Sequence, residues 1–381
     1  MSTRSASICW AQKDRSNAMD KKERSTLLQN KKLKQAAKAI GRPVAMLLAA
    51  IIIVMIFLAV SGYGPSAVLI GIRRAVTTDI AGSIRYITPM ILAGIAVCIP
   101  FKTQAYNLGV DGQIYMGAIA ATAVGLNLPQ DMNHLLGMLI IFAAGMAAGA
   151  IYALLAAGMK IYCNTDLVVS TLLLNFIAEW FTEYMAADLL RDVDATVQMN
   201  ASKLLNENFW LPRLTAFGPT SANVGIYIAI AVALLAGFLF FKTSLGYEIK
   251  IVGTNEDFAR YGGMKPKAVT MKVMGLSGAV AGIIGVIEVT AVQHRLMAGF
   301  NPSFGFDGIV VSLLANNNPL GVLLSGTFFG ILKNAGANME RATDVPEIIT
   351  QVTMAIVILA ISANIVVKKT KKRRAKHGSA V

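Results

Sequence analysis

The sequence predicts an all-α polytopic membrane protein with about ten transmembrane helices. Hydrophobic residues make up 55% of the 381 positions and charged residues only 15%, whereas soluble globular chains carry about 25% charged residues. Several apolar runs approach the roughly 20 residues that a helix needs to cross a bilayer. The basic residues gather outside these runs, at the two ends of the chain. Together these observations exclude an ordinary soluble domain.

Ten segments are apolar enough to be candidate spans. The first is an almost unbroken apolar run, and the second is short for a span. A polar stretch, 188–223, separates the fifth segment from the sixth, and three asparagines and a proline at 316–319 separate the eighth from the ninth. The ten segments are 44–61, 86–101, 105–126, 134–158, 166–187, 224–241, 269–292, 304–315, 320–333 and 346–367.

The charge distribution indicates how the chain is divided and oriented. Residues 1–42 contain 11 Lys or Arg and 3 Asp or Glu, and residues 368–381 contain 7 Lys or Arg and no acid. Because Lys and Arg accumulate on the cytoplasmic side of membrane proteins, we expect both ends in the cytoplasm and an even number of crossings. The predicted regions are a basic N-terminal arm (1–43), a transmembrane domain (44–367) and a basic tail (368–381).

Ten crossings satisfy this orientation, and eight crossings plus a re-entrant pair near 304–335 also satisfy it. With ten, loop 242–268 lies inside, and loops 62–85, 188–223, 294–303 and 334–345 lie outside. Nucleic acid is not an expected partner, because the basic residues lie outside the apolar body, one group at each end. Attraction to anionic lipid is a plausible second role for them.

One short motif occurs twice. Residues 108–112 and 304–308, which are 196 positions apart, both read x-Gly-x-Asp-Gly at the start of an apolar segment. With ten crossings the third span runs outward and the eighth inward, as in an inverted-topology transporter repeat. The alternative is two separate helix starts, each with an Asp near the positive end of the helix.

Small residues recur inside the predicted spans at a spacing that favours close packing. Glycines four positions apart allow two helix backbones to approach closely in lipid. We therefore expect a tightly packed helical bundle. The pairs are Gly145 and Gly149, Gly278 and Gly282, and Gly326 and Gly330.

Four segments resemble the permease subunits of bacterial ABC importers for simple sugars and nucleosides, in the right order and spacing over 44–367. Segment 101–118 contains Asn-Leu-Gly-Val-Asp-Gly-Gln, which is similar to the signature of the branch that works with basic-membrane-protein-type lipoproteins. Segment 164–175 ends in Ser-Thr-Leu-Leu-Leu-Asn, another family pattern. Segment 252–264 resembles the family's cytoplasmic loop, except that Ala is usual where Gly262 stands. The fourth segment, 299–319, contains Phe-Asp-Gly-Ile and then Asn-Asn-Pro.

The resemblance implies a permease that moves nucleosides across the bacterial cytoplasmic membrane by alternating access. It implies three kinds of partner: ABC ATPase subunits, a second permease subunit that we expect to be a homologous chain, and an extracytoplasmic substrate-binding lipoprotein. The chain would then be neither an enzyme nor the holder of a cofactor, since the ATPase uses the ATP. The sequence indeed contains no Gly-x-x-x-x-Gly-Lys-(Ser/Thr) phosphate loop.

Loop 242–268 is the expected docking site for the ATPase. Asn255 is a natural N-cap for a short helix with acidic residues in its first turn, and Gly262 and Gly263 would end it. An exposed short helix with aromatic side chains can lie in a groove of a partner. The alternative is an ordinary surface turn. The residues expected to couple are Gly253, Asn255, Glu256, Phe258, Ala259, Arg260, Tyr261, Gly262 and Gly263.

Ionisable residues within spans tend to face a bundle interior or a water-filled path, because they are costly in lipid. Glu288, deep in the seventh span, is the best single candidate for lining a path, and a hydrogen bond to a neighbouring helix is its alternative. Asp111 and Asp307 lie in the repeated motif, where helix capping is the alternative. Glu179 and Glu183, near the end of the fifth span, are expected to reach water instead.

Polar amides in apolar surroundings are the other candidates for the path. An amide can bind sugar hydroxyls and purine edges without fixing a charge, which suits an uncharged substrate. Hydrogen bonding between helices is the alternative. These amides are Asn107, Gln113, Asn175, Asn317 and Asn318.

No metal site is predicted. Cys9, Cys98 and Cys163 have neither paired nor metal-ligand spacing, and His134 and His294 stand alone near span ends.

The residues also leave two other functions open. The same ABC machinery could carry a monosaccharide of the ribose or galactose type, because delivery specificity lies largely in another protein. Alternatively, an ion-coupled secondary transporter could use Asp111, Glu288 or Asp307, and it would work without an ATPase and stop when the ion gradient collapses.

Overall fold

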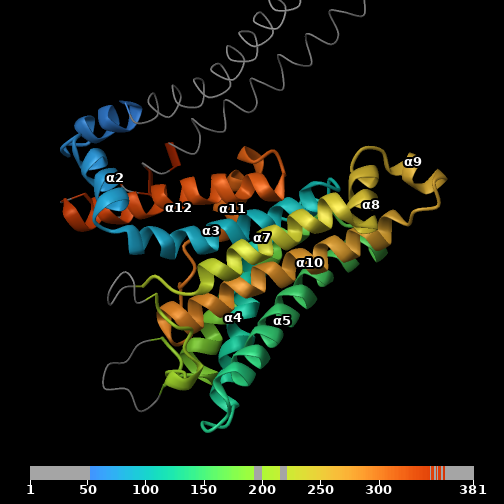
Figure 1. Cartoon of the computed structure of the whole chain (residues 1–381), viewed down its shortest axis with the longest axis horizontal. Helices are drawn as coiled ribbons and strands as arrows, with labels where there is room; N and C mark the ends of the chain where they lie inside the picture. The colour runs from blue at the N-terminus through green and yellow to red at the C-terminus, as the bar shows by residue number, and fades with distance from the viewer. Residues whose placement is uncertain are drawn as a thin grey trace, which may run out of the picture.

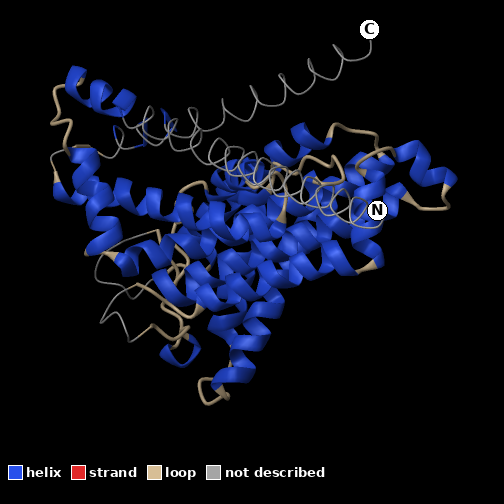
Figure 2. Ribbon diagram, turned by 45° about the horizontal axis from the view of Figure 1, so that its top comes forward, coloured by secondary structure: helices blue, strands red, loops and turns tan. Residues whose placement is uncertain are grey.

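The computed structural model describes residues 52–192, 200–214, 221–343, 345–346, 349, 351–352 and 355–356. Apart from three isolated β-bridges, the described residues form helices and the loops between them (Figure 2). The predicted all-α class is confirmed over this part of the chain. The arm 1–43, the tail 368–381 and most of the tenth predicted span lie outside it.

The helices follow one another with short connections, except for one long excursion between α6 and α7. Residues 52–60 of the first predicted span are helical. The further elements are α2 (Ala67–Thr77), α3 (Ile80–Phe101), α4 (Val110–Asn127), α5 (His134–Tyr162), α6 (Leu167–Tyr184), the π-helix η1 (Met185–Leu189), the 3-10 turn η2 (Glu207–Phe209), α7 (Gly225–Lys242), α8 (Ser244–Val252), α9 (Glu256–Tyr261), α10 (Pro266–Ile287), the π-helix η4 (Glu288–Gln293), α11 (Phe304–Leu314) and α12 (Pro319–Ala342).

Five helices among the described residues are long and apolar enough to cross a membrane: α3, α5, α7, α10 continued by η4, and α12. Helix α11 is apolar but shorter. The chain is therefore a multi-pass membrane protein. The number of ten crossings stays a prediction.

The structure corrects three predicted boundaries. Residues 67–77, predicted as part of an outside loop, form α2. Helix α3 begins at Ile80 rather than at position 86, because the side chain of Asp79 caps it by accepting from the Gly82 N–H at 3.0 Å. Arg85 therefore lies within a helix. Helix α12 continues to Ala342, so most of the predicted loop 334–345 is helical.

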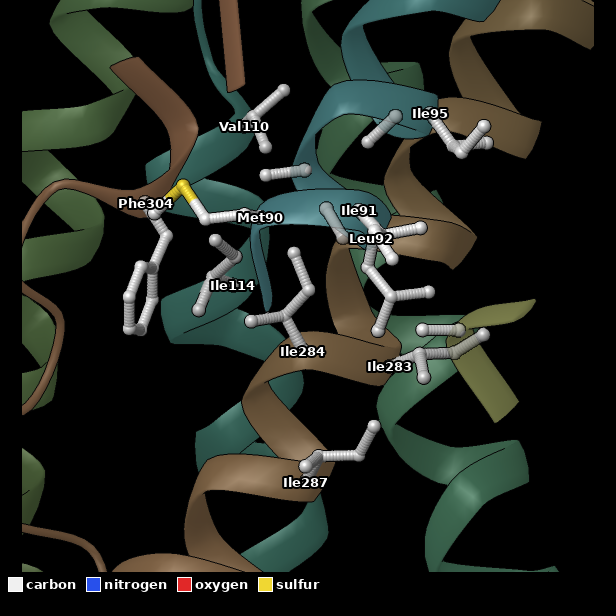
Figure 3. Close-up of a cluster of buried hydrophobic side chains, with 14 of the residues drawn as sticks. Met90, Ile91, Leu92, Ile95, Val110, Ile114, Ile283, Ile284, Ile287 and Phe304 are labelled. Carbon is white, nitrogen blue, oxygen red and sulfur yellow. The ribbon is translucent and has the colours of Figure 1, made fainter. Parts of the chain in front are cut away.

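Two helices form the centre of the bundle. In α3, and in α10 continued by η4, 78% of the most apolar stretch of 18 residues is buried within the protein. Helix α10 packs against α4 and α5, and α3 packs against α11 and α12. Figure 3 shows the apolar side chains where the two groups meet. They are Met90, Ile91, Leu92 and Ile95 of α3, Val110 and Ile114 of α4, Ile283, Ile284 and Ile287 of α10, and Phe304 of α11.

The glycine spacing does produce close packing, as predicted. Helices α5 and α10 cross where Gly145 and Gly149 face Gly278 and Gly282. A Cβ atom on Gly282 would lie 2.2 Å from the Gly145 carbonyl oxygen, and one on Gly149 would lie 2.3 Å from the Gly278 oxygen. Both distances are far below van der Waals contact, so only glycine allows this approach of the two backbones.

The bundle has two distinct ends (Figure 1). At one end, α8 and α9 project beside the C-terminus of α3 and the start of α10. At the other end lie α2, the start of α3, the end of η4 and the C-terminal part of α12.

Candidate translocation path and coupling site

Asp111 joins the N-termini of two helices near the middle of the bundle. It is the second residue of α4 and is 5% exposed. Its Oδ1 accepts hydrogen bonds from the Asn301 side chain at 2.7 Å and the Gly305 N–H at 2.8 Å, and its Oδ2 accepts from the Phe306 N–H at 3.2 Å. The free N–H groups and the dipole at the start of α11 favour a negative charge here. Asp111 thus caps α11, a helix other than its own.

Asp307 occupies the matching position of the second motif but has a different partner. It forms an ion pair with Lys333 of α12. The Lys333 ammonium also donates to the Pro302 carbonyl oxygen at 2.8 Å and lies 5.4 Å from the centroid of the Phe304 ring. The two aspartates therefore fix α11 from two sides, one against α4 and one against α12.

Asn107 and Gln113 belong to a buried amide cluster that links three helices. Asn107 Nδ2 donates to Ser277 Oγ of α10 at 2.9 Å and to Gln113 Oε1 at 3.2 Å. Gln113 Nε2 donates back to Asn107 Oδ1 at 3.1 Å, and Ser277 Oγ donates to the Ala96 carbonyl of α3 at 2.6 Å. In this conformation the amides bind protein groups, as expected for hydrogen bonding between helices.

Asn175 of α6 fixes the start of α4. Its Oδ1 accepts from the Gly112 N–H and its Nδ2 donates to the Leu108 carbonyl, both at 2.8 Å. Asn317 and Asn318 lie in the turn between α11 and α12, where Asn316 and Asn317 have positive φ angles of 54° and 53°. The Asn318 side chain caps α12 by accepting from the Leu320 N–H at 3.1 Å. The predicted break at 316–319 is present.

Glu288 is buried opposite Arg85 at the junction of α10 and η4. It is 1% exposed, and its Oε2 lies 3.5 Å from a terminal nitrogen of Arg85. Glu288 Oε2 and Arg85 Nε are both buried without a hydrogen-bond partner. At this distance the ion pair contributes little net free energy to folding. Removal of either charge would nevertheless leave the other buried without a partner, which is costly. A π-helix within a longer helix is frequently found at functional sites.

A cavity of about 420 Å³ opens beside this ion pair, at the end of the bundle away from α9. Arg213, on the excursion between α6 and α7, lies in its wall. The wall also contains Asp79, Gly82, Arg85, Tyr86, Ser221, Ala291, Val292, Gln293, Asn334 and Arg341.

His294 holds Arg213 at the cavity. The imidazole stacks on the Trp210 ring with centroids 3.9 Å apart. Its Nδ1 lies 3.1 Å from the Thr290 carbonyl oxygen, and its Nε2 lies 3.2 Å from a terminal nitrogen of Arg213. Burial lowers the pKa of His294 below its usual range; the Arg213 charge lowers the pKa further, while the bond to Thr290 opposes both. The neutral imidazole therefore donates from Nδ1 and accepts from Arg213 at Nε2.

The predicted short helix in loop 242–268 is α9. Asn255 is its N-cap and accepts from the Phe258 N–H at 3.0 Å, and Gly262 follows its last residue. Ala259 is buried, whereas Phe258 is 61% and Tyr261 93% exposed. Helix α9 thus turns one small side chain inward and two aromatic rings to the outside. Glu256 pairs with Arg260 at 2.6 Å on the exposed side, and Gly263 has a φ of 78°.

Gly253 attaches the α8–α9 segment to the end of α3. Its carbonyl oxygen accepts from Gln104 Nε2 at 2.7 Å. A Cβ on Gly253 would lie 1.9 Å from the Lys102 carbonyl oxygen, so the contact requires glycine. Beside it a groove of about 710 Å³ is lined by α9, by the segment after α3 and by the segment between α5 and α6.

The residues that the sequence did not single out are the partners of those that it did. Arg85, Lys333, Ser277, Arg213 and Gln104 each hold a predicted residue or a cavity wall. Arg85 and Lys333 stand at the ends of predicted spans, and a rule that pairs each intramembrane acid with a basic residue would have indicated them. Ser277 and Gln104 carry no such signal.

Comparison with known proteins places most of this chain in one family. Residues 80–367 match the family model described as branched-chain amino acid transport system / permease component. The guanosine ABC transporter permease protein NupP of Bacillus subtilis is 32% identical over 326 residues, which cover 84% of this chain and 92% of that protein.

Two further relatives differ in what their names say they carry. The nucleoside ABC transporter permease protein NupB of Lactococcus lactis is 30% identical over 73% of this chain and 78% of its own. The glucose ABC transporter permease protein TsgB13 of Haloferax volcanii is 32% identical over 71% of this chain and 72% of its own.

Proposed function

Because this chain belongs to the family of branched-chain amino acid transport system permease components, we propose that it is the permease subunit of an ATP-driven nucleoside importer. It is an ABC transporter permease component, and this family works with ATPase partners. The nucleoside assignment rests on one observation above others: the likeness to a guanosine permease extends over 84% of this chain and 92% of that protein.

In the proposed mechanism, two halves of an inverted repeat move against each other in alternating access. The packing supports such a repeat. Helix α10 lies against α4 and α5, and α3 lies against α11 and α12, so the partners exchange when α3 is matched with α10 and α4 with α11. Such an exchange is the pattern that a two-fold repeat produces. The repeated motif lies at the starts of α4 and α11, where Asp111 joins them.

The candidate path residues are assigned to this moving interface. Asp111, Asp307, Glu288, Asn107, Gln113, Asn175, Asn317 and Asn318 all lie at contacts between helices or in the turn that joins two of them. We assign them to the path as groups whose protein bonds are exchanged for substrate bonds when the halves move. A buried, satisfied amide can make that exchange with little change in free energy.

The α8–α9 segment is the proposed contact with the ATPase. The exposed Phe258 and Tyr261 rings provide apolar surface for a partner to bind, and the adjoining groove provides a recess for the partner's side chains. The coupling set is Gly253, Asn255, Glu256, Phe258, Ala259, Arg260, Tyr261, Gly262 and Gly263. Motion of this segment reaches the bundle through Gly253 and Gln104, which is three residues before Asn107.

The remaining parts of the proposal concern assembly and orientation. The region 44–367 is the permease domain, and the arm 1–43 and tail 368–381 lie in the cytoplasm with α9. A second permease subunit, which is a homologous chain, stands beside this one. An extracytoplasmic lipoprotein delivers the substrate, and ATP is used only by the ATPase, so this chain carries no cofactor.

Uptake measurements test the function directly. Cells with and without this chain are given labelled guanosine, adenosine, uridine, ribose or glucose, before and after ATP depletion and after addition of an uncoupler. We expect ATP-dependent nucleoside uptake to be lost on deletion. Loss of ribose or glucose uptake alone would replace the nucleoside by a monosaccharide, the second candidate that the Haloferax relative favours. Uptake that depends only on the ion gradient would overturn the whole proposal.

A double variant at Gly253, where the α8–α9 segment contacts the end of α3, and at Arg260 of α9 tests the coupling role. Gly253→Leu with Arg260→Ala is expected to abolish uptake while the permease stays in the membrane, because the added side chain overlaps the Lys102 carbonyl. Phe258→Ser with Tyr261→Ser is the milder companion, since both rings are exposed and their loss leaves the bundle intact. Undiminished uptake and ATPase co-purification in both variants would show that α9 is an ordinary surface turn.

A further inference from the structure

Two carboxylates of α6 have no partner within the bundle. Glu179 and Glu183 lie one turn apart on this helix, and both are half-buried. Neither carboxylate forms a hydrogen bond or an ion pair with any residue that the structure describes. Helices α4 and α6 contain no Lys or Arg that could neutralise them. Acids in membrane helices almost always pair with another group or face a water-filled path, so these two require polar surroundings beside α6.

Contacts with α4 place Glu179 at mid-depth in the bundle. Asn175, one turn before Glu179, donates to the Leu108 carbonyl at 2.8 Å. Asn107, the neighbour of Leu108 in the chain, donates to Ser277 Oγ at 2.9 Å. Ser277 is the twelfth of the 28 residues of α10 and η4. Glu179 therefore lies too deep for its side chain to reach the water at either end of the bundle.

A buried tyrosine of α4 faces the same two carboxylates. Tyr115 is 5% exposed, and its ring packs edge-on against Phe300 with centroids 5.3 Å apart. The charges of Glu179 and Glu183 act on the Tyr115 hydroxyl, so the three groups share one region. The hydroxyl makes no hydrogen bond with a described residue, yet it is not one of the atoms sealed from the surface. A side chain so deeply buried with an open, unbonded hydroxyl indicates that a polar ligand completes its bonding.

The same side of α6 carries two exposed aromatic rings. Positions i, i+3, i+4 and i+7 lie along one side of a helix, and here they are Phe176, Glu179, Trp180 and Glu183. Phe176 is 59% and Trp180 68% exposed. Aromatic rings alone would suit lipid, but lipid does not tolerate the two carboxylates beside them. These four residues and Tyr115 are called the α4–α6 strip below.

We propose that the α4–α6 strip lines the translocation path and binds the nucleoside, with its rings stacked on the base and its carboxylates bonded to the ribose hydroxyls. The proposal rests on the nucleoside function proposed above and names the groups of the substrate that are recognised. An ionised carboxylate only accepts hydrogen bonds, and the 2′ and 3′ hydroxyls of ribose supply donors. Every base has a face that stacks on an aromatic ring, so the strip suits purine and pyrimidine nucleosides alike.

The composition of the strip also predicts what it rejects. The two negative charges repel the phosphate of a nucleotide. A nucleoside without 2′ and 3′ hydroxyls brings no ribose donors to the carboxylates, and ribose alone brings no base to the rings. An organic cation is the rival ligand, because it would pair with the carboxylates and lie against the rings. Choline therefore serves as a competitor in the test.

Cysteine labelling tests whether the strip faces a path or lipid. The permease–ATPase complex in lipid nanodiscs carries Cys9, Cys98 and Cys163 changed to Ser, with either Trp180→Cys or Ile177→Cys added. Ile177 is the matched control, because it is 59% exposed but lies on another side of α6. A hydrophilic methanethiosulfonate should label Trp180→Cys at least about tenfold faster, since lipid suppresses the reactive thiolate. Equal labelling of both positions, with and without ATP, would overturn the inference.

Protection from labelling tests the ligand. Guanosine at ten times its dissociation constant should slow the labelling of Trp180→Cys about elevenfold. At the same concentration, 2′,3′-dideoxyguanosine, guanosine 5′-monophosphate, ribose and choline should each protect at least about tenfold less, because each lacks a required group or carries a repelled charge. Protection by ribose equal to that by guanosine would assign the strip to a monosaccharide, and stronger protection by choline would assign it to a cation. Either result contradicts the proposal.

Two conservative variants, each made with Trp180→Cys, test the individual groups. Glu179→Gln with Glu183→Gln should weaken protection by guanosine about tenfold and narrow the difference from its monophosphate, because amides accept less strongly and carry no charge. Tyr115→Phe keeps the ring and should weaken protection about fivefold. Glu207→Gln, at an exposed acid of η2, is the control and should change nothing. Unchanged protection in the double Gln variant would mean that the carboxylates do not bind the ligand.

Uptake by cells separates the two proposals. If wild-type cells import nucleosides with ATP but guanosine does not protect Trp180→Cys, only the assignment of the strip is wrong. If wild-type cells import no nucleoside, the proposed function itself is wrong, whatever the labelling shows.

Discussion

At the scale of single residues, the Arg85–Glu288 pair is where the bundle is most sensitive to charge. The two groups are 3.5 Å apart, and Glu288 is 1% exposed. Removing one charge leaves the other buried and uncompensated, whereas replacing both by apolar groups removes the need for a partner. A single substitution should therefore destabilise the protein strongly, whereas the double substitution should destabilise it much less.

Glu288→Leu alone, or Arg85→Met alone, should lower the free energy of unfolding by about 3 kcal/mol. Arg85→Met combined with Glu288→Leu should recover most of this loss. The apparent melting temperatures of the four purified proteins in detergent measure the cycle. If the two losses simply add in the double variant, the pair has no interaction of its own, and Glu288 has another partner.

His294 gives the protein a dependence on pH. The pKa of His294 is lowered in the fold, whereas in the unfolded chain a histidine titrates near its ordinary value of about 6.5. Between these two values the unfolded chain binds more protons, so the contribution of His294 to stability is complete above about pH 6.5 and is lost as the pH falls. Protonation at Nε2 would also set a second cation against Arg213.

We expect the apparent melting temperature of the wild type to fall more steeply below about pH 6.5 than that of His294→Gln, which cannot titrate there. Other groups titrate in both proteins, so the difference between the two curves isolates His294. Parallel curves would mean that the imidazole already carries its proton in the fold or that its contacts contribute nothing.

At the scale of elements, the α5–α10 crossing depends on the absence of side chains at four positions. Gly282→Ala should destabilise the protein by about 1–3 kcal/mol, because its Cβ would lie 2.2 Å from backbone. Gly275→Ala, in the same helix, is the control: its Cβ would lie 3.5 Å from a Leu154 side-chain atom, an ordinary contact. It should be neutral or stabilising by up to about 1 kcal/mol. Similar effects of both changes on thermal unfolding would mean that helix propensity, not the crossing, decides.

The elements also show which parts of the fold the sequence predicts. Apolar length indicates α5, α7 and α10 well, and glycine spacing adds to it in α5 and α10, because both signals belong to the helix itself. The start of α3 and the end of α12 were missed for one shared reason. Arg85, Asn334 and Asn338 are polar residues within helices, and their partners come from other helices. Polar residues in the sequence suggest a loop, although here they lie within helices and make tertiary contacts.

The same limit applies to the candidate site. The short helix α9 and the turn at 316–319 could be predicted, because caps and turn residues act locally. The contact of Asp111 with α11 could not, since it joins residues 194 and 195 positions apart. The cavity at Arg213 joins four separate segments of the chain, and no spacing in the sequence records it.

At the scale of the whole molecule, the proposed function requires that the two ends of the bundle face opposite sides of the membrane. Cys163 and Ser221 report on the two ends, because Cys163 is exposed between α5 and α6, near the groove beside α9, and Ser221 lies in the wall of the Arg213 cavity. Cys98 is buried and should not react.

Single-cysteine chains turn this geometry into a measurement of orientation. With Cys9 and Cys98 changed to Ser, a membrane-impermeant maleimide should label Cys163 in inverted vesicles and not in intact cells. With all three cysteines changed to Ser and Ser221→Cys added, the labelling should be reversed. Labelling of both positions from the same side would contradict the single predicted crossing, 166–187, that separates them. The opposite pattern would place α9 outside the cell, where no ATPase could reach it, and the coupling assignment would have to be abandoned.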